Sequence, residues 1–260
     1  MSDTILELDH IEKHFGDTGV LHGVSLSVQH GEFVTLLGPS GCGKTTTLRI
    51  IAGLETPDAG RVVLRGKDVT AAPPEKRDVN TVFQNYALFP HMSVAANIGY
   101  SLRLKKMPRA EIAKEVDAAL ELVQLSGYGA RMPAELSGGQ RQRVAIARTL
   151  LKDNNVLIFD DSLSAVDMQT DRAIREELRR KRQGVTTIII SHRINTLCEA
   201  DRIFVLENGS LSDEGTHEEL TRRKGLYQQI FAIQSALEDD LQRSRDAVAK
   251  EESECKDMRK

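Results

Sequence analysis

The stretch Gly38-Pro39-Ser40-Gly41-Cys42-Gly43-Lys44-Thr45 has the G-x-x-x-x-G-K-[ST] spacing of a phosphate-binding P-loop. Its three glycines let the backbone curl so that successive N–H groups point at one anion. In such a loop, Lys44 is expected to reach the β- and γ-phosphates of a nucleotide. The Thr45 hydroxyl is expected to ligate Mg²⁺.

The segments on both sides of this loop have the character that a phosphate site needs. Phe33-Val34-Thr35-Leu36-Leu37 is a short apolar run that predicts a buried strand. Residues 46–52 have helical character, and Gly53 is expected to end the helix. The helix N-terminus would add unpaired N–H donors and a positive dipole end. The alternative is a glycine-rich turn with an incidental lysine, and the flanking strand and helix disfavour it.

A second apolar run, Val156-Leu157-Ile158-Phe159, ends at Asp160. A carboxylate at the C-terminal end of a strand can hold Mg²⁺, or a water bound to it, opposite Thr45. An aspartate that merely caps a turn is the simpler interpretation. The P-loop upstream favours the metal-binding role.

Leu136-Ser137-Gly138-Gly139-Gln140 is predicted to open a helix. Ser137 and Gln140 have the spacing of a capping box, which would explain these two residues by helix stability alone. A plain cap does not need two glycines, because glycine weakens a helix start. The pair is expected where a group such as a phosphate must approach the backbone closely.

The pattern around these motifs predicts an α/β protein with a mainly parallel core sheet. Residues 4–37 alternate in the manner of strands, the P-loop strand included, and an N-terminal antiparallel β subdomain is expected beside the core sheet. Helical spacing dominates from about residue 90 to 150, with segments at Ser93–Leu104, Arg109–Leu125 and Gly139–Leu151. Strands and helices then alternate again as far as Arg202–Leu206. We therefore expect one domain over residues 1–236 with an inserted helical subdomain.

Composition excludes several classes of protein. The chain has 260 residues, 40% of them hydrophobic and 28% charged, and its net charge of −3 gives no sign of a nucleic-acid-binding surface. Its three cysteines are too few and too scattered for a disulfide framework or a zinc site, which favours a reducing compartment. No apolar run approaches the roughly 20 residues that span a bilayer. Residues 237–260 are rich in charge of both signs, so we expect a frayed helix or disorder there.

With these motifs assembled, residues 4–235 resemble the ATP-binding cassette (ABC) ATPase family. The resemblance is specific because the motifs occur in the family's order and spacing. They are the P-loop, Gln84 after a strand, Leu136–Gln140, the Asp160 strand, Ser164-Ala165-Val166-Asp167, and His192 after a strand.

The resemblance implies a role for each matching residue. Phe15 would stack on adenine, Gln84 would contact Mg²⁺ and the attacking water, and His192 would contact the γ-phosphate. The nucleotide-binding set it implies is Phe15, Val20, Gly38, Ser40, Gly41, Cys42, Gly43, Lys44, Thr45, Thr46, Ser137, Gly138, Gly139 and Gln140. The implied Mg²⁺ ligands are Thr45, Gln84 and Asp160, and the implied catalytic residues are Lys44, Gln84, Asp161 and His192.

The same resemblance implies ATP and Mg²⁺ as cofactors and a head-to-tail dimer with two ATPs between the subunits. Ser137 and Gly139 would contact the γ-phosphate bound by the other subunit, and Asp167 would lie at the dimer interface. A membrane permease would dock near residues 84–110. The expected protein is thus the ATP-hydrolysing subunit of a transporter, cytoplasmic and peripheral on the inner face of the membrane. A soluble ABC ATPase of translation or DNA repair is the less favoured alternative.

One departure concerns the residue after Asp160, which is Asp161 where the family usually has a glutamate as general base. Aspartate is shorter by one C–C bond, about 1.5 Å. A general base must lie within roughly 3 Å of the proton it takes, or act through a water. Hydrolysis is therefore expected to be slow, or the chain pairs with a subunit bearing a glutamate. A hydrolysis-poor, ATP-gated dimerisation module remains the alternative function.

A second departure is that the two halves resemble different branches of the family. Residues 4–150 resemble an importer ATPase of the polyamine type, above all in Lys67–Thr70 and Pro73–Pro90. Residues 154–235 resemble an exporter domain, in Asp160–Asp167, Ser191-His192-Arg193 and Gly215–Leu220. The chain is either a natural intermediate or a hybrid joined near Leu151–Asn155. Uptake of polyamines is the expected transport function, because the surface expected to bind the permease lies in the importer-like half.

Overall fold

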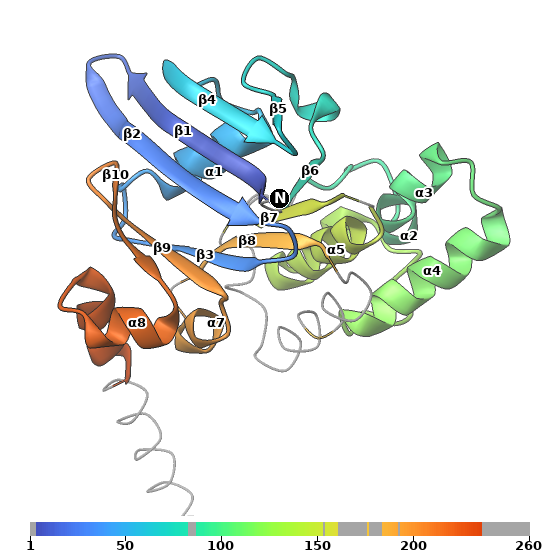
Figure 1. Cartoon of the computed structure of the whole chain (residues 1–260). Coiled ribbons are helices and arrows are strands. Elements are labelled where there is room, and N and C mark those ends of the chain that lie inside the picture. The colour runs from blue at the N-terminus through green and yellow to red at the C-terminus, as the bar shows by residue number, and fades with distance from the viewer. Residues whose placement is uncertain are drawn as a thin grey trace, which may run out of the picture.

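The computed structural model describes residues 4–82, 87–152, 154–160, 176, 184–191 and 193–235. Within these residues two sheets lie one above the other, with helices between and beside them (Figure 1). One sheet has four strands in the order β2-β1-β4-β5, and the other has six in the order β10-β9-β3-β8-β7-β6. This arrangement confirms the predicted α/β class with an N-terminal antiparallel subdomain.

The four-stranded sheet is antiparallel throughout. Its strands are β1 (Thr4–Phe15), β2 (Thr18–Gln29), β4 (Ala59–Leu64) and β5 (Lys67–Asp68). Buried and exposed residues alternate along β2, as expected for a sheet with one solvated face. Leu8 pairs with Leu26 on β2 and with Val62 on β4, so that apolar residues line the buried face.

The six-stranded sheet is parallel except at one edge. Its strands are β3 (Phe33–Leu37), β6 (Val79–Val82), β7 (Val156–Phe159), β8 (Thr186–Ile190), β9 (Arg202–Glu207) and β10 (Ser210–Gly215). Only β10 runs antiparallel, beside β9. Every residue of β7 and β8 is buried, which explains why the sequence shows unbroken apolar runs there rather than alternation.

Helices cover both faces of this core sheet. On one face α1 (Lys44–Ala52) shares a core cluster with residues of both sheets. On the other face α5 (Gly138–Leu150) packs against Leu157, Phe159 and Ile189. Alternate side chains of the core strands therefore pack on opposite faces of the core sheet, in two different clusters. The cluster that contains α1 also contains residues of the four-stranded sheet, so the P-loop helix is held between the two sheets.

The helical block differs in detail from its expected bounds. It consists of α2 (Val94–Ile98), α3 (Tyr100–Leu104), α4 (Arg109–Leu122) and α5. The 3₁₀ turn η1 (Pro74–Lys76) comes before β6, and a second, η2 (Pro133–Glu135), lies between α4 and α5. The expected single segment Ser93–Leu104 is wrong, because the chain divides at Gly99. A Cβ atom there would lie 2.8 Å from Cγ2 of Ile112, so glycine lets α4 approach. The expected end of α4 at Leu125 is also wrong, since Gln124 adopts a φ of 55°.

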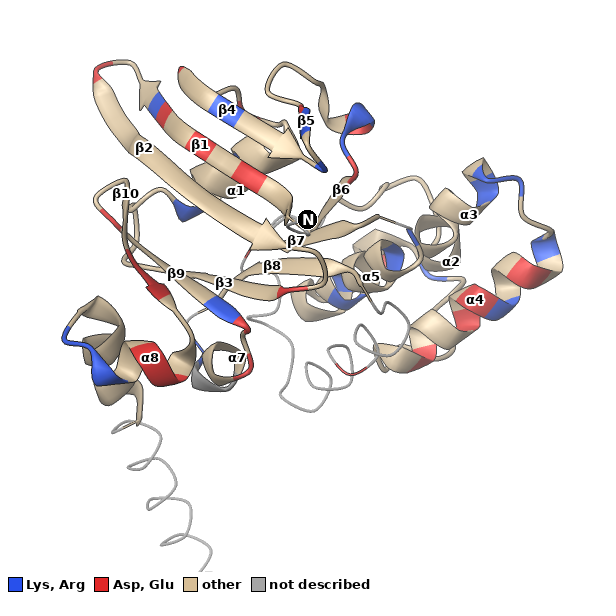
Figure 2. Ribbon diagram, viewed as in Figure 1, with Lys and Arg blue, Asp and Glu red and all other residues tan. Residues whose placement is uncertain are grey.

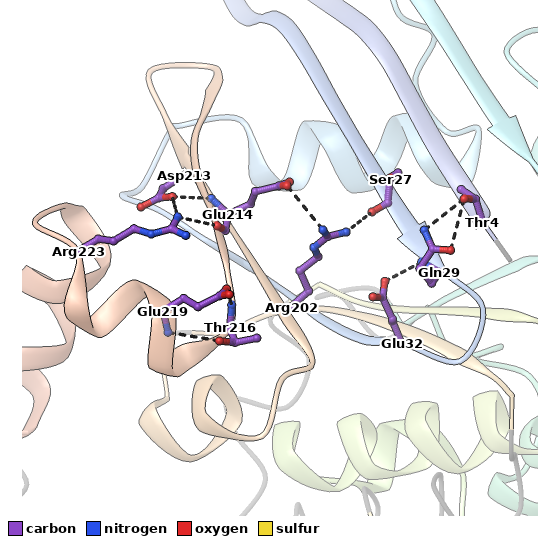
Figure 3. Close-up of polar contacts among 10 residues, drawn as sticks. All are labelled: Thr4, Ser27, Gln29, Glu32, Arg202, Asp213, Glu214, Thr216, Glu219 and Arg223. Atoms are coloured by element: carbon purple, nitrogen blue, oxygen red, sulfur yellow. Dashed lines mark hydrogen bonds and ion pairs between the residues drawn. The ribbon is translucent and has the colours of Figure 1, made fainter. Parts of the chain in front are cut away.

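The two halves of the sequence interleave in the core sheet. β3 and β6 come from before residue 152, and they lie beside β8 and β7 from after it. The Gly31 N–H donates to Oγ1 of Thr186 at 2.9 Å. Arg202 on β9 donates to the carbonyl of Ser27 on β2 at 3.3 Å, a contact drawn in Figure 3. Any mismatch between the halves would therefore fall inside the core.

α7 (Ile194–Cys198) precedes β9, and α8 (His217–Arg222) follows β10, after which residues 226–235 are again helical. Thr216 and Glu219 form a complete capping box at the start of α8 (Figure 3). Arg223 closes this end by an ion pair with Asp213 at 3.0 Å. The charged segment 237–260 and residues 161–175 and 177–183 lie outside the described residues.

Charge is mixed over the surface rather than gathered in one field. Figure 2 shows residues of both signs along β1, α4 and α8. Among the described residues, no helix is both long enough and apolar enough to cross a membrane.

Candidate nucleotide site

The P-loop links the end of β3 to the start of α1, as predicted. Gly38, Gly41 and Gly43 all have positive φ, at 153°, 80° and 103°, a region that side chains other than glycine rarely enter. A Cβ atom on Gly38 would overlap the Leu206 carbonyl and lie 2.7 Å from Sγ of Cys42. The glycines are therefore required by backbone conformation, and at Gly38 by space as well.

Lys44 lies at the centre of the loop. Its Nζ donates hydrogen bonds to the carbonyls of Gly38 and Pro39 at 2.7 and 2.8 Å, and lies 3.6 Å from Sγ of Cys42. The side chain is only 8% exposed. The ammonium is thus fixed within the curl of the loop, where backbone N–H groups and α1 favour an anion.

Thr45 and Asp160 meet at the mouth of this loop. The Thr45 hydroxyl donates to Oδ1 of Asp160 at 3.2 Å. A hydroxyl and a carboxylate are hard oxygen donors of the kind that Mg²⁺ takes together with phosphate oxygens. The predicted juxtaposition of these two residues is present, and the donor set fits an Mg²⁺ ion.

A pocket of about 570 Å³ opens beside the loop. Its described lining is Phe15, Val20, Ser40, Gly41, Gly43, Lys44, Thr45, Thr46, Asp160 and Ile190. All of these except Ile190 were predicted from the sequence. Ile190 ends β8, where parallel strands present their carboxyl ends and where α/β folds bind ligands.

Phe15 lines the pocket with half of its surface exposed. Nζ of Lys13 lies 5.2 Å from the centre of the Phe15 ring. Lys13 is itself held by Glu55 at 3.0 Å and Asp58 at 3.3 Å, and the hydrogen bond to Glu55 is the main cause of its raised pKa. Sequence reasoning missed Lys13, because its partners lie more than 40 positions away.

Residues Ser137–Gln140 lie outside this pocket. They start α5 with a complete capping box, in which Gln140 N donates to Ser137 Oγ at 3.3 Å and Ser137 N donates to Gln140 Oε1 at 2.9 Å. A Cβ atom on Gly138 would meet nothing within 4 Å. The cap explains Ser137 and Gln140, but packing within the described chain does not explain Gly138.

Three predicted catalytic residues, Gln84, Asp161 and His192, lie outside the described residues, as do Ser164–Asp167. Asp160, which precedes Asp161, lines the pocket. β6 ends two positions before Gln84, and the Asp160 N–H donates to its last carbonyl, that of Val82, at 3.4 Å. Ile190, two positions before His192, lines the pocket.

Comparison with known proteins identifies the family. Residues 21–164, more than half of the chain, match the family described as ABC transporter. The chain belongs to the ABC transporter family. This agrees with the P-loop, the Asp160 strand and the capped Leu136–Gln140 segment, and it confirms the resemblance stated above.

The curated relatives of this ABC chain include polyamine importers. It is 45% identical over 221 residues to the spermidine/putrescine import ATP-binding protein PotA of Oleidesulfovibrio alaskensis, covering 84% of this chain and 59% of that protein. It is 48% identical over 216 residues to PotA of Salmonella typhimurium, covering 82% and 57%. The chain thus spans about six tenths of the length of the relatives it matches.

Solved structures extend the likeness to exporters. A bacterial Atm1-family ABC exporter with ATP bound superposes with a TM-score of 0.79 and 33% identity, over 90% of this chain and 42% of that one. The dimeric, post-hydrolysis ATP-binding cassette MJ0796 with ADP and Pi gives a TM-score of 0.75 and 29% identity, over 82% and 98%. Importers and exporters, the two branches expected from the sequence, therefore both occur among its relatives.

Proposed function

We propose that the chain is the ATP-binding and ATP-hydrolysing subunit of an ABC transporter that drives polyamine uptake through a separate membrane permease. The observation that carries the ATPase assignment is the meeting of Thr45 and Asp160 at the P-loop mouth, 3.2 Å apart. The polyamine assignment rests on the importer relatives alone.

The residues of the nucleotide site each have a definite task in this proposal. The P-loop N–H groups and Lys44 bind the triphosphate and offset the charge that develops on the transferred phosphoryl group. Phe15 stacks on the base, and Thr45 with Asp160 holds Mg²⁺. An Mg²⁺ ion held by these oxygens would offset negative charge on the nucleotide phosphates. By sequence, Asp161 polarises the attacking water, aided by His192 and Gln84.

The proposal requires a dimer, and the start of α5 supports it. Ser137–Gln140 lie away from the pocket of their own chain, yet Gly138 leaves its backbone open. A helix N-terminus with an open backbone suits a phosphate presented by a second subunit. We propose a head-to-tail pairing, with an identical chain or a different cassette, that adds Ser137, Gly138, Gly139 and Gln140 to the partner's site.

A second pocket, of about 380 Å³, supports docking of a permease helix. It lies between β6 and the helical block, and its lining includes Phe89, Tyr100, Leu104, Arg148 and Lys152. Leu104 is 67% exposed. An apolar groove of this kind suits an amphipathic helix from another protein. Such docking would hold the chain at the inner face of the membrane.

The alternative function is a hydrolysis-poor dimerisation module, which Asp161 in place of the usual glutamate favours.

Two experiments test the proposal. ATP should raise the melting temperature of the wild type and fail to do so for Lys44→Ala. The permease of a polyamine importer should stimulate ATP hydrolysis, whereas copurification with an exporter transmembrane domain alone would contradict the import assignment.

A further inference from the structure

Arg77 lies at the C-terminal end of α1, the helix that begins with Lys44, and it is only 5% exposed. Its guanidinium donates four hydrogen bonds, and all four acceptors are backbone carbonyls. Nη1 reaches Ile50 at 2.6 Å and Ile51 at 3.0 Å, Nη2 reaches Thr70 at 3.0 Å, and Nε reaches Ala72 at 2.9 Å. One side chain therefore joins the last turn of α1 to the loop before η1.

The charge of Arg77 is balanced in an uncommon way. In the part of the chain that the structure describes, its guanidinium forms no ion pair, and burial lowers its pKa. Burying an unpaired charge is costly unless other groups compensate it. Here the carbonyls at the negative end of the α1 dipole provide that compensation. The planar guanidinium fits these divergent acceptors, which a lysine ammonium would not match.

Gly53 leaves the space that the Arg77 guanidinium occupies. It ends α1 in the left-handed conformation, with a φ of 77°. A Cβ atom at Gly53 would lie 2.6 Å from Nε of Arg77. The Ile50 carbonyl accepts from both the Gly53 N–H at 3.1 Å and the Arg77 guanidinium, so the cap and the arginine share one acceptor.

Through the main chain, Arg77 also leads directly into β6, the strand that precedes Gln84 in the sequence. β6 begins two residues later and pairs in parallel with β7, with Val82 opposite Phe159. Asp160 follows at the end of β7, and Gln84 follows β6 in sequence. Arg77 thus connects the far end of the P-loop helix to the two strands that end at the nucleotide pocket.

We propose that Arg77 is a positioning residue that couples the P-loop helix to the strand leading to Gln84. The inference rests on the proposed ATP site. Phosphate binding at the start of α1 displaces or steadies the helix as a rigid body of about 13 Å. The guanidinium transmits that change to residues 78–82, which lead into and form β6. Because β6 pairs with β7, this coupling sets the position of Asp160 at the end of β7 when the P-loop is loaded.

Amide hydrogen exchange with and without ATP tests the proposal in the full chain. Arg77→Lys keeps the charge but not the four bonds. Arg65→Lys is the matched control, because Arg65 is a half-exposed neighbour that bonds to Asn155 and pairs with Asp78 at 3.7 Å, a charge that lysine keeps, without reaching α1. ATP should slow exchange over residues 78–82 in the wild type and in Arg65→Lys. In Arg77→Lys this slowing should disappear, while the Kd for ATP changes less than about threefold and kcat falls about tenfold.

Three results would overturn the inference. The first is ATP-dependent slowing of amide exchange that persists in Arg77→Lys. The second is the absence of such slowing in a wild type that binds ATP. The third is an equal loss of protection in the remote helix α8, which would make Arg77 a general structural support. Coupling without any hydrolysis would instead contradict the proposed ATPase function and leave the role of Arg77 intact. Failure of the wild type to bind ATP would overturn both.

Discussion

The Thr45 hydroxyl donates to Oδ1 of Asp160 at 3.2 Å, although 115 positions separate the two residues. The end of β7 and the start of α1 bring them together, and both lie in one pocket with Lys44. This pair of oxygen donors beside a fixed ammonium connects the fold to the proposed chemistry, and the predictions below follow from it and its surroundings.

Removing either oxygen donor should impair Mg²⁺-dependent hydrolysis. We expect Asp160→Asn and Thr45→Ala to lower kcat on the order of 100-fold, because a bound metal contributes several kcal/mol to stabilising the transition state. Thr45→Ser keeps the hydroxyl and should retain most of the activity. Steady-state ATPase assays over a range of Mg²⁺ concentrations measure the effect. Equal activity in Thr45→Ala and Thr45→Ser would argue against a metal-binding role.

The glycine at the start of α5 should matter for pairing and not for folding. Gly138→Ala should leave the melting temperature unchanged or slightly raised, because the added methyl group meets nothing within 4 Å and alanine favours helix. ATP-dependent dimerisation should weaken by at least tenfold. Sedimentation with a non-hydrolysable ATP analogue measures the dimer fraction. An unaltered dimer would exclude the proposed contact.

Ser137→Ala provides the contrasting variant at the same helix start. It removes the hydroxyl that accepts from the Gln140 N–H, so we expect a loss of about 1 kcal/mol in the free energy of unfolding. Chemical denaturation followed by circular dichroism gives this value. A variant as stable as the wild type would show that the capping box contributes little here.

Asp78 should make stability depend on pH across the junction of the two halves. Burial alone would raise its pKa, but hydrogen bonds from the Asn155 side chain and backbone and from Asn154 outweigh burial, so its folded-state pKa is lowered. A lowered pKa means that stabilisation is present above the unfolded value of about 3.9 and is lost as pH falls through the lower folded value.

The test of this linkage is the melting temperature between pH 6 and pH 3. The wild type should lose more stability over this range than Asp78→Asn, because that variant cannot be protonated at this position. Parallel pH profiles for the two proteins would refute the linkage. A large loss for Asp78→Asn at pH 6 would fit a junction that depends on this carboxylate.

The rate of thiol alkylation should distinguish Cys42 from Cys198. Cys42 is buried within the P-loop, with Sγ 3.6 Å from Nζ of Lys44, whereas Cys198 is exposed. We expect Cys42 to react at least tenfold more slowly than Cys198, and ATP to slow it further. Mass spectrometry after timed treatment with iodoacetamide gives both rates in one sample. Equal rates at Cys42 with and without ATP would contradict the predicted nucleotide pose.

Sequence reasoning reached the chemistry of the site because spacing fixes it locally. The loop 38–45 shows its own glycine pattern, and Asp160 follows an unbroken apolar run that only a buried parallel strand explains. The order of motifs then identified the family. Local spacing also predicted the capping box of Ser137 and Gln140, and it linked the two glycines beside it to a phosphate that approaches the backbone.

Other features escaped prediction because their cause lies in tertiary contacts. The division of the segment 93–104 at Gly99 depends on the approach of Ile112, which no helical periodicity reveals. Lys13 contacts Phe15 locally, but its partner Asp58 is 45 positions away. Arg77 stands within the stretch that resembles importers, yet its acceptors Ile50 and Ile51 belong to another element. Sequence patterns report periodicity and motifs, and they do not report such partners.

The most direct test of the account is steady-state ATPase activity as a function of protein concentration for the wild type, Lys44→Ala and Asp161→Glu. The account predicts that activity per molecule of wild type rises with concentration, because two chains complete each site. It also predicts that Lys44→Ala abolishes activity and that Asp161→Glu increases it. Wild-type activity near background, restored only by Asp161→Glu, would contradict the proposed motor and favour an ATP-gated dimerisation module that needs a glutamate-bearing partner.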